Sequence, residues 1–200
     1  MSYTTSVEAL WGTGLMVSGF GFMLNNQLTD FNFVPRRRGA PSDADFDPGA
    51  NDVAPFKRPR SSMAPTIVFA RDDRGEYPIA AYGSPGGSAI INTLLNVTLD
   101  LVDHRLPIDQ AVKRPRISLT QPTGDATTMI ESGFDAGVLD QLRALGYRFP
   151  EQPSVIGAVQ AAVVIDPDSR ALFGYGDARR NGTAIGLPRR RCDGEPCLRQ

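Results

Sequence analysis

The hydrophobic pattern of the chain changes period several times, which predicts a mixture of strands and helices. Short apolar or alternating runs bounded by turn residues are typical of strands. We predict strands at residues 3–11, 15–24, 66–70, 77–82, 116–119, 127–131, 158–165 and 171–175. Turn-forming residues at 72–75 and 166–169 join neighbouring runs, so each of these pairs is expected to form an antiparallel hairpin.

Helical spacing appears in the segments between these strands. Residues 89–104 are apolar on nearly all sides, which predicts a buried helix whose N-terminus Ser88 could cap. A short helix is expected to begin at Pro107, and an amphipathic helix capped by Asp135 is expected to end near Gly146. Hairpins plus helices without a regular βαβ alternation predict an α+β fold, with antiparallel sheet covered by helices.

A glycine-rich turn at residues 83–88, Gly-Ser-Pro-Gly-Gly-Ser, leads into the most apolar helix. Such a turn presents unpaired backbone N–H groups at the positive end of a helix dipole. It therefore suits an anion: a phosphate, a carboxylate or the oxyanion of an acyl-transfer intermediate. The turn lacks the lysine and hydroxyl of a nucleotide-binding P-loop, and it does not match the dinucleotide fingerprint.

The length of 200 residues predicts one domain, which we place at residues 1–188, followed by a tail at 189–200. Residues 32–60, rich in proline, glycine and clustered charges, are expected to form a long loop that could act as a lid. A formal net charge of -1 gives no general attraction to nucleic acid or to an anionic membrane. We expect no membrane span and see no secretory signal, which leaves the location of the protein open.

The residues best suited to metal binding are few. The chain has 2 cysteines, Cys192 and Cys197, whose spacing does not match the tighter zinc motifs. They are either free thiols on a loose tail or a disulfide across a small loop. The single histidine, His104, ends the apolar helix, where a structural role is favoured over catalysis. We therefore expect neither a metal nor another cofactor.

Three longer motifs occur together in this chain. They are Leu-Asn-Asn-Gln-Leu-Thr-Asp-Phe at 24–31, Arg-Pro-Arg-Ser-Ser-Met-Ala-Pro-Thr at 58–66, and the turn at 83–88. In this order and at these separations they resemble the γ-glutamyltransferase (glutathione hydrolase) family, and segments at 102–104, 110–116 and 177–184 resemble it too. The resemblance implies an N-terminal-nucleophile hydrolase fold, an αββα sandwich of which this chain is the small-subunit part. It also implies a large-subunit partner from the same proenzyme and a γ-glutamyl substrate such as glutathione.

The first two motifs carry over the residues that bind the amino-acid head of the substrate. By this resemblance, Ser61 and Ser62 hold the α-carboxylate of the γ-glutamyl group. Asp30 binds its α-ammonium group and is supported by Gln27. A zwitterionic head needs both an anionic partner and a hydroxyl or cationic partner, so these residue types suit the chemistry.

The resemblance assigns further roles at both ends of the matched region. Glu8 stands where the family has an Asn or Glu that contacts the ammonium, and Ser6 stands at a Thr or Ser position beside the nucleophile. Gly86 and Gly87 are implied to form an oxyanion hole through their backbone N–H groups. Spacing alone leaves open whether Glu8 and Asp30 meet.

The nucleophile is expected to be absent. The family uses the N-terminal threonine of its small subunit as both nucleophile and base, and the sequence begins after the matching position. Thr4 and Thr5 fall in the following segment by register. Two alternatives to an enzyme of this family therefore stay open: a non-catalytic or partner-dependent γ-glutamyl-binding chain, and a cephalosporin-acylase-like amidohydrolase.

Overall fold

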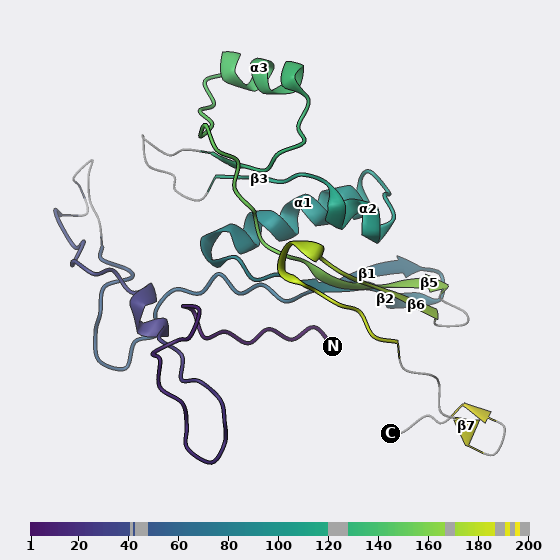
Figure 1. Cartoon of the computed structure of the whole chain (residues 1–200), viewed down its shortest axis with the longest axis horizontal. Helices are drawn as coiled ribbons and strands as arrows, with labels where there is room; N and C mark the ends of the chain where they lie inside the picture. Colours follow the sequence, from purple (N-terminus) through teal and green to yellow (C-terminus); the bar gives the residue numbers. More distant parts are fainter. Residues whose placement is uncertain are drawn as a thin grey trace. The chain divides into compact units, whose positions relative to one another are not determined.

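The computed structural model describes residues 1–40, 42, 48–119, 128–166, 171–186, 191–192 and 195–196 (Figure 1). The chain divides into two compact units. The sheet unit comprises Met1–Tyr3 and Ala64–Gln200, and the loop unit comprises Thr4–Met63. The predicted boundary at residue 188 lies outside the described residues and stays a prediction, as does the tail beyond it.

A four-stranded antiparallel sheet forms the centre of the sheet unit, in the order β1-β2-β5-β6. The strands are β1 (Thr66–Asp72), β2 (Gly75–Gly83), β5 (Gln160–Asp166) and β6 (Ala171–Gly176). Asp72 pairs with Gly75 across the first turn, and Asp166 pairs with Ala171 across the second. Both predicted hairpins are thus confirmed, although residues 167–170 of the second turn lie outside the described residues.

Shorter strands make separate two-stranded pairs. β3 (Ile117–Ser118) pairs with β4 (Met129–Ile130), close to the two short strands predicted there. Residue 127 of that prediction lies outside the described residues. β7 (Arg191–Cys192) pairs with β8 (Glu195–Pro196) near the C-terminus. Cys197 is not among the described residues, so the state of the cysteine pair stays open.

Helices α1 (Ile90–Val102) and α2 (Ile108–Lys113) lie on one side of the sheet (Figure 1). Their apolar side chains join those of β2 and β5 in one core, because the sheet can bury its apolar face only against another apolar surface. The buried core residues are Ala80, Tyr82, Ile90, Leu94, Val97, Ile108, Ala111, Val112, Val159 and Ala161. The α+β prediction is therefore confirmed.

The third helix, α3 (Ala136–Ala144), begins as predicted. The Asp135 carboxylate accepts a hydrogen bond from Val138 N at 3.1 Å, which caps the helix. Gly146 follows the helix with a φ of 95°, a conformation that favours glycine. None of the residues of α3 is buried, so the described part of the chain covers its amphipathic face only partly.

Two details of α1 differ from the prediction. Ser88 does not cap it: Ser88 lies inside the 3-10 turn η2 (Gly87–Ala89), and Ala89 stands at the N-cap without a side-chain bond. The helix is also not buried all round, since Ile91 and Leu95 are 57% and 52% exposed. The sheet covers only one face of α1, and composition alone could not show that its other apolar face stays exposed among the described residues.

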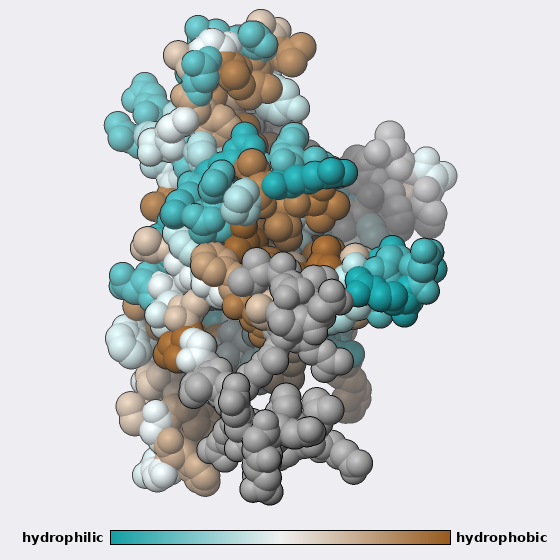
Figure 2. Space-filling model, turned by 90° about the vertical axis from the view of Figure 1, so that its right-hand side faces the viewer, coloured by the Kyte–Doolittle hydropathy of each residue, from teal (hydrophilic) through white to brown (hydrophobic). Residues whose placement is uncertain are grey.

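The sheet is likewise covered on one face. Val68 packs against the core, whereas its neighbours Ile67 and Phe69 are 40% and 52% exposed on the opposite face. Leu172 on β6 is exposed too. Apolar side chains are visible at the surface in Figure 2. The sheet unit therefore consists of one helical layer on one sheet layer.

The loop unit contains little regular structure. Its described residues include one 3-10 turn, η1 (Gln27–Asp30), and one isolated bridge between Met16 and Met23. The strands predicted at 3–11 and 15–24 are therefore wrong. A strand needs a ladder of backbone bonds to a neighbouring strand. Among the described residues, 3–11 accepts one such bond from another segment, from Asn26 N to the Val7 carbonyl, and 15–24 folds back on itself.

The core can be tested with two adjacent leucines of α1. Leu94 is 4% exposed and Leu95 is 52% exposed. Leu94→Ala leaves a cavity beneath the sheet and is expected to lower the free energy of unfolding by about 2–5 kcal/mol. Leu95→Ala, the matched control, should lower it by about 1 kcal/mol or less. Urea denaturation followed by circular dichroism measures both, and equal losses would contradict this core.

Candidate functional site

The predicted site residues fall in both units. Those expected to bind the amino-acid head of a substrate lie in the loop unit: Ser6, Glu8, Gln27, Asp30, Ser61 and Ser62. The predicted oxyanion-hole residues, Gly86 and Gly87, lie in the sheet unit.

Hydrogen bonds tie the N-terminal segment of the loop unit to η1. Gln27 Nε2 donates to Ser6 Oγ at 3.2 Å, which joins two of the predicted residues directly. Asn26 Nδ2 donates to the Glu8 carboxylate at 2.5 Å, and Asn26 Oδ1 accepts from Ala9 N at 2.9 Å. Glu8 and Ser6 are therefore both anchored to the turn that carries Asp30.

Glu8 has a backbone conformation that is unusual for its residue type. Its φ is 70°, in the left-handed region that residues other than glycine seldom occupy. The Ser6 hydroxyl oxygen accepts the Glu8 N–H at 3.1 Å, and the Glu8 carboxylate bonds to Asn26. These bonds hold the strained backbone in place, and strain of this kind is often found at functional sites.

A single amide side chain connects the Asp30 segment to the serine segment. Asn51 Nδ2 donates to the Asp30 carbonyl oxygen at 2.7 Å, and Asn51 Oδ1 accepts from Arg60 N at 2.9 Å. Ser61 follows Arg60 directly, so Asn51 brings Asp30 and the two serines into one part of the loop unit. The half-buried Asp30 carboxylate accepts no hydrogen bond from any described residue and is available to a cation.

Asp52, the next residue, organises the rest of this segment. Its carboxylate accepts from Asn32 Nδ2 at 2.7 Å and from the backbone N–H groups of Arg36 and Arg37 at 3.0 and 3.1 Å. The bond from Asn32 and those from the N–H groups hold the pKa of Asp52 below its ordinary value. Asn51 and Asp52 did not stand out in the sequence. Their only signal was the Gly-Ala-Asn-Asp run, which is typical of side chains that bond to nearby backbone.

The glycine turn in the sheet unit has the features expected of an anion site. Gly86 and Gly87 have φ values of 141° and 55°, which few other residues adopt. The hydrogen bonds of the described residues include none donated by either glycine N–H, whereas the Gly86 carbonyl accepts from Ala89 N at 3.1 Å. The turn therefore offers two adjacent N–H donors at the start of η2 and α1.

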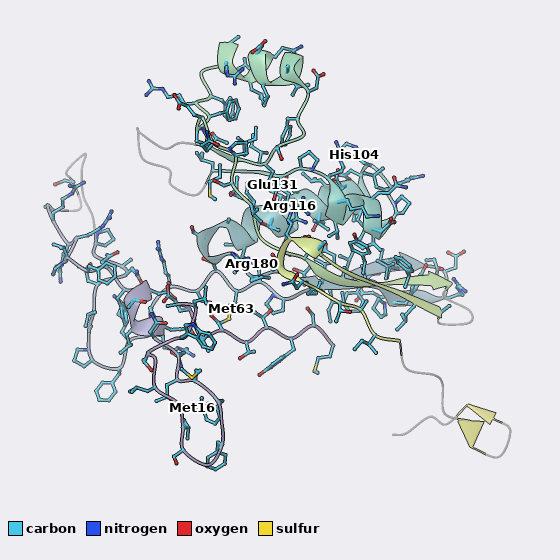
Figure 3. All side chains as sticks on the ribbon, in the orientation of Figure 1. Met16, Met63, His104, Arg116, Glu131 and Arg180 are labelled. Atoms are coloured by element: carbon cyan, nitrogen blue, oxygen red, sulfur yellow. The ribbon has the colours of Figure 1, made fainter. Side chains whose placement is uncertain are left out.

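A buried ion network lies behind this turn, and its members were not predicted as a group. Arg116 Nη2 and the Asp177 carboxylate are 2.7 Å apart, and their side chains are 2% and 3% exposed. Arg179 pairs with both Asp177 and Glu131, at 3.2 and 2.8 Å. Figure 3 shows the labelled Arg116 and Glu131 together beside α1. We use the name ion network for Arg116, Glu131, Asp177 and Arg179.

One carboxylate of this network, Asp177, is stabilised in its charged form. Burial alone would raise the pKa of Asp177, but hydrogen bonds from Arg179 N–H, the Arg116 guanidinium and Val159 N–H outweigh it and lower the pKa. Sequence patterns did not predict this arrangement, because the partners are far apart along the chain and charged residues are usually exposed.

The other candidate groups among the described residues are not arranged for catalysis or metal binding. His104 is exposed and lies apart from Arg116 and Glu131 in Figure 3. Within the described residues, no cluster of His, Cys, Asp and Glu side chains could hold a metal ion. No helix in the part of the chain that the structure describes is long and apolar enough to cross a bilayer.

Comparison with known proteins identifies the family. The family model described as gamma-glutamyltranspeptidase matches residues 1–187. The chain is 40% identical over 187 residues to the glutathione hydrolase proenzyme of Bacillus subtilis (strain 168), and 33% identical over 180 residues to that of Escherichia coli (strain K12). These matches cover 94% and 90% of this chain. The chain belongs to the γ-glutamyltranspeptidase family, whose members are N-terminal-nucleophile hydrolases.

Solved structures agree with this assignment. The chain matches a gamma-glutamyltranspeptidase from Pseudomonas nitroreducens complexed with L-DON, with a TM-score of 0.74 and 30% identity over 94% of this chain and 93% of that chain. It matches the Helicobacter pylori T380A mutant with a TM-score of 0.73 and 34% identity, over 90% and 93% of the two chains. The predicted fold, part of an N-terminal-nucleophile hydrolase sandwich, is confirmed. The chain spans 28% of the length of the Bacillus proenzyme.

The lowered pKa of Asp177 predicts how stability changes with pH. Because the folded pKa lies below the unfolded value of about 3.9, ionised Asp177 contributes stability above about pH 4, and that contribution is lost as the pH falls toward the folded pKa. Asp177→Asn leaves Arg116 buried without its partner, which should cost about 3–5 kcal/mol at pH 7. The variant should also lose less stability than the wild type between about pH 4 and pH 2.

Urea midpoints between pH 2 and pH 7 measure this effect. Asp140→Asn is the matched control, because it breaks an exposed ion pair in which the Asp140 and Arg143 side chains are 74% and 54% exposed. The control should follow the wild-type pH dependence. An acid-side loss of stability that is identical in wild type and Asp177→Asn would show that Asp177 does not contribute as described.

Proposed function

We propose that this chain supplies the γ-glutamyl-binding residues of a γ-glutamyltransferase or glutathione hydrolase, acting on glutathione or related γ-glutamyl amides. In this proposal Asp30 and Glu8 bind the α-ammonium of the γ-glutamyl group, and Gln27 supports Asp30. Ser61 and Ser62 donate hydrogen bonds to its α-carboxylate. Membership of the family supports the reaction class.

One observation carries the proposal: the tie that Asn51 makes between Asp30 and the residue before Ser61. An α-amino acid presents an ammonium and a carboxylate on the same carbon, so its receptor needs an anion and neutral donors close together. The free carboxylate of Asp30 suits the ammonium, and the serine hydroxyls suit the carboxylate. A glutaryl group has no ammonium, so a carboxylate at this position favours glutamyl over glutaryl.

Several contacts support the remaining roles. Ser6, bonded to both Gln27 and the Glu8 N–H, is proposed to hold the ammonium-binding residues in register. The unpaired N–H groups of Gly86 and Gly87 are proposed to stabilise the negative oxygen of a tetrahedral acyl-transfer intermediate. Such donors contribute mainly in the transition state, so they would affect turnover more than substrate affinity.

We also propose a large-subunit partner from the same proenzyme. The curated relatives are named proenzymes, and this chain matches less than a third of their length. The exposed apolar side chains of Ile67, Phe69 and Leu172 lie on a sheet face that the described residues leave partly uncovered. A second apolar layer on that face would remove this surface from water, as in a four-layer sandwich.

Asp30→Asn tests recognition of the ammonium. In the protein as its complete gene produces it, the variant should lower kcat/KM for a γ-glutamyl anilide about 10–100-fold, the value of a charge-assisted hydrogen bond. Residual hydrolysis of a glutaryl anilide should change by about threefold or less, because that substrate has no ammonium to lose. Release of the aniline gives both rates.

Asp73→Asn, an exposed carboxylate in the β1–β2 turn, is the matched control and should leave both rates unchanged. An equal loss for both substrates in Asp30→Asn would contradict the assigned role. A wild-type protein that hydrolyses neither substrate would favour the non-catalytic alternative, and one that prefers the glutaryl anilide would favour the acylase alternative.

Asn51→Ala tests the tie between the two binding segments. Loss of both hydrogen bonds should let the Asp30 and Ser61 segments move apart, so KM for the γ-glutamyl anilide should rise about tenfold, with a smaller change in kcat. Steady-state kinetics measure this directly. An unchanged KM would show that Asn51 does not set the spacing of the two segments.

A further inference from the structure

A short buried segment lies between the ion network and the glycine turn. Residues 156–159 are buried, with Ile156, Ala158 and Val159 at 0% exposed. No catalytic role follows from their side chains, which are small or apolar. Their backbone groups, however, are bonded on one side to the ion network and on the other side to the turn.

The backbone of residues 156–159 packs closely against the backbone of the glycine turn. Ala158 N donates to Ser84 Oγ at 2.9 Å, and Ser84 Oγ donates to the Pro85 carbonyl at 2.7 Å. A Cβ on Gly86 would lie 3.2 Å from Gly157 Cα, and one on Gly157 would lie 2.7 Å from Ser84 Oγ. Because neither segment has room for a side chain here, a shift of residues 156–159 moves the turn as well.

The ion network fixes the position of residues 156–159. Glu131 Oε1 accepts from Ile156 N at 2.8 Å, and Arg116 Nη1 donates to the Ile156 carbonyl at 2.8 Å. At the other end, Asp177 Oδ2 accepts from Val159 N at 3.0 Å. Thus the peptide groups at both ends of the segment bond to charged members of the network.

The network itself is cross-linked and balanced in charge. Arg179 donates to both carboxylates and also to the carbonyls of Val112 and Arg114, at 2.8 and 3.0 Å. Arg116 N donates to Glu131 Oε2 at 3.0 Å. Charge-assisted hydrogen bonds in a buried site are strong and geometrically selective, so the network favours one arrangement of residues 156–159.

We infer that Glu131 and Asp177, with their arginine partners, are positioning residues that hold the Gly86 and Gly87 N–H groups in place through residues 156–159 and Ser84. The inference rests on the proposed function for what these N–H groups bind, but not for how they are held. Loss of a network carboxylate should therefore loosen the turn and lower turnover, with little change in substrate affinity.

Nuclear magnetic resonance relaxation on the 200-residue chain tests the positioning directly. In the wild type, the backbone order parameters of Gly86 and Gly87 should be about 0.85, the value of rigid backbone. In Glu131→Gln and Asp177→Asn they should fall below about 0.6, the range of flexible backbone. Leu101→Ala is the control for lost stability. It removes a core contact about 16 Å along α1 from the turn and should leave both order parameters unchanged.

Ser84→Ala provides a second test that leaves the ion network intact. It removes the acceptor of Ala158 N, and it should lower the same order parameters. If a network variant does not fold, the Ser84→Ala result tests the inference. Unchanged order parameters in Ser84→Ala, or in network variants that melt as low as Leu101→Ala, would overturn the inference and leave the network a purely structural role.

Kinetics of the protein as its complete gene produces it distinguish this inference from the proposed function. Asp177→Asn should lower kcat for a γ-glutamyl anilide about 10–100-fold, and the larger value equals the smallest effect expected when an oxyanion-hole donor is removed. KM should change by about twofold or less. A fall in order parameters without any wild-type hydrolysis would support the positioning and refute the proposed function. A fall in kcat with unchanged order parameters would refute the positioning alone.

Discussion

The buried ion pair between Arg116 and Asp177 is the interaction on which the sheet unit most depends. Two charges removed from water cost several kcal/mol each unless hydrogen bonds and opposite charge compensate them. Here Asp177 also accepts from Val159 N, and Arg116 also donates to the carbonyls of Ile156 and Val112. The pair therefore joins α2, the start of β5 and the segment after β6, elements that the apolar core alone would not hold in register.

The loop unit is organised by a different principle. Few of its described apolar side chains are buried, and it is held instead by amide and carboxylate side chains that bond to backbone: Asn26, Asn51 and Asp52. Such bonds fix irregular backbone without a regular ladder. This leaves the Asp30 carboxylate without a hydrogen-bond partner among the described residues and keeps Glu8 in a strained conformation.

The sequence predicted the features that depend on local pattern. Both hairpins, the short helix after Pro107 and the Asp135 cap follow from turn residues, helix-start signals and period. The strands at 3–11 and 15–24 failed because β-forming residues need a neighbouring strand, and local pattern does not reveal whether one is present. The prediction that α1 is buried on all sides failed for a similar reason. An apolar composition does not show which faces of a helix another element covers.

The candidate site shows the same division. Motif resemblance assigned Ser6, Glu8, Gln27, Asp30, Ser61, Ser62, Gly86 and Gly87, whose roles stay predictions. It did not point to the residues that support them. Asn51 bonds to Asp30 and Arg60, which lie 21 and 9 positions away along the chain. Asp177 pairs with Arg116, which lies 61 positions away. Supporting contacts of this kind come from tertiary structure, and no short pattern in a single sequence encodes them.

The most direct measurement is a crystal structure of the protein, as its complete gene produces it, with L-glutamate bound. The α-ammonium is predicted to lie within hydrogen-bonding distance of the Asp30 carboxylate, and the α-carboxylate is predicted to accept from the hydroxyls of Ser61 and Ser62. L-Glutamate bound with its ammonium away from Asp30, or with its α-carboxylate away from both serines, would contradict γ-glutamyl recognition by this chain.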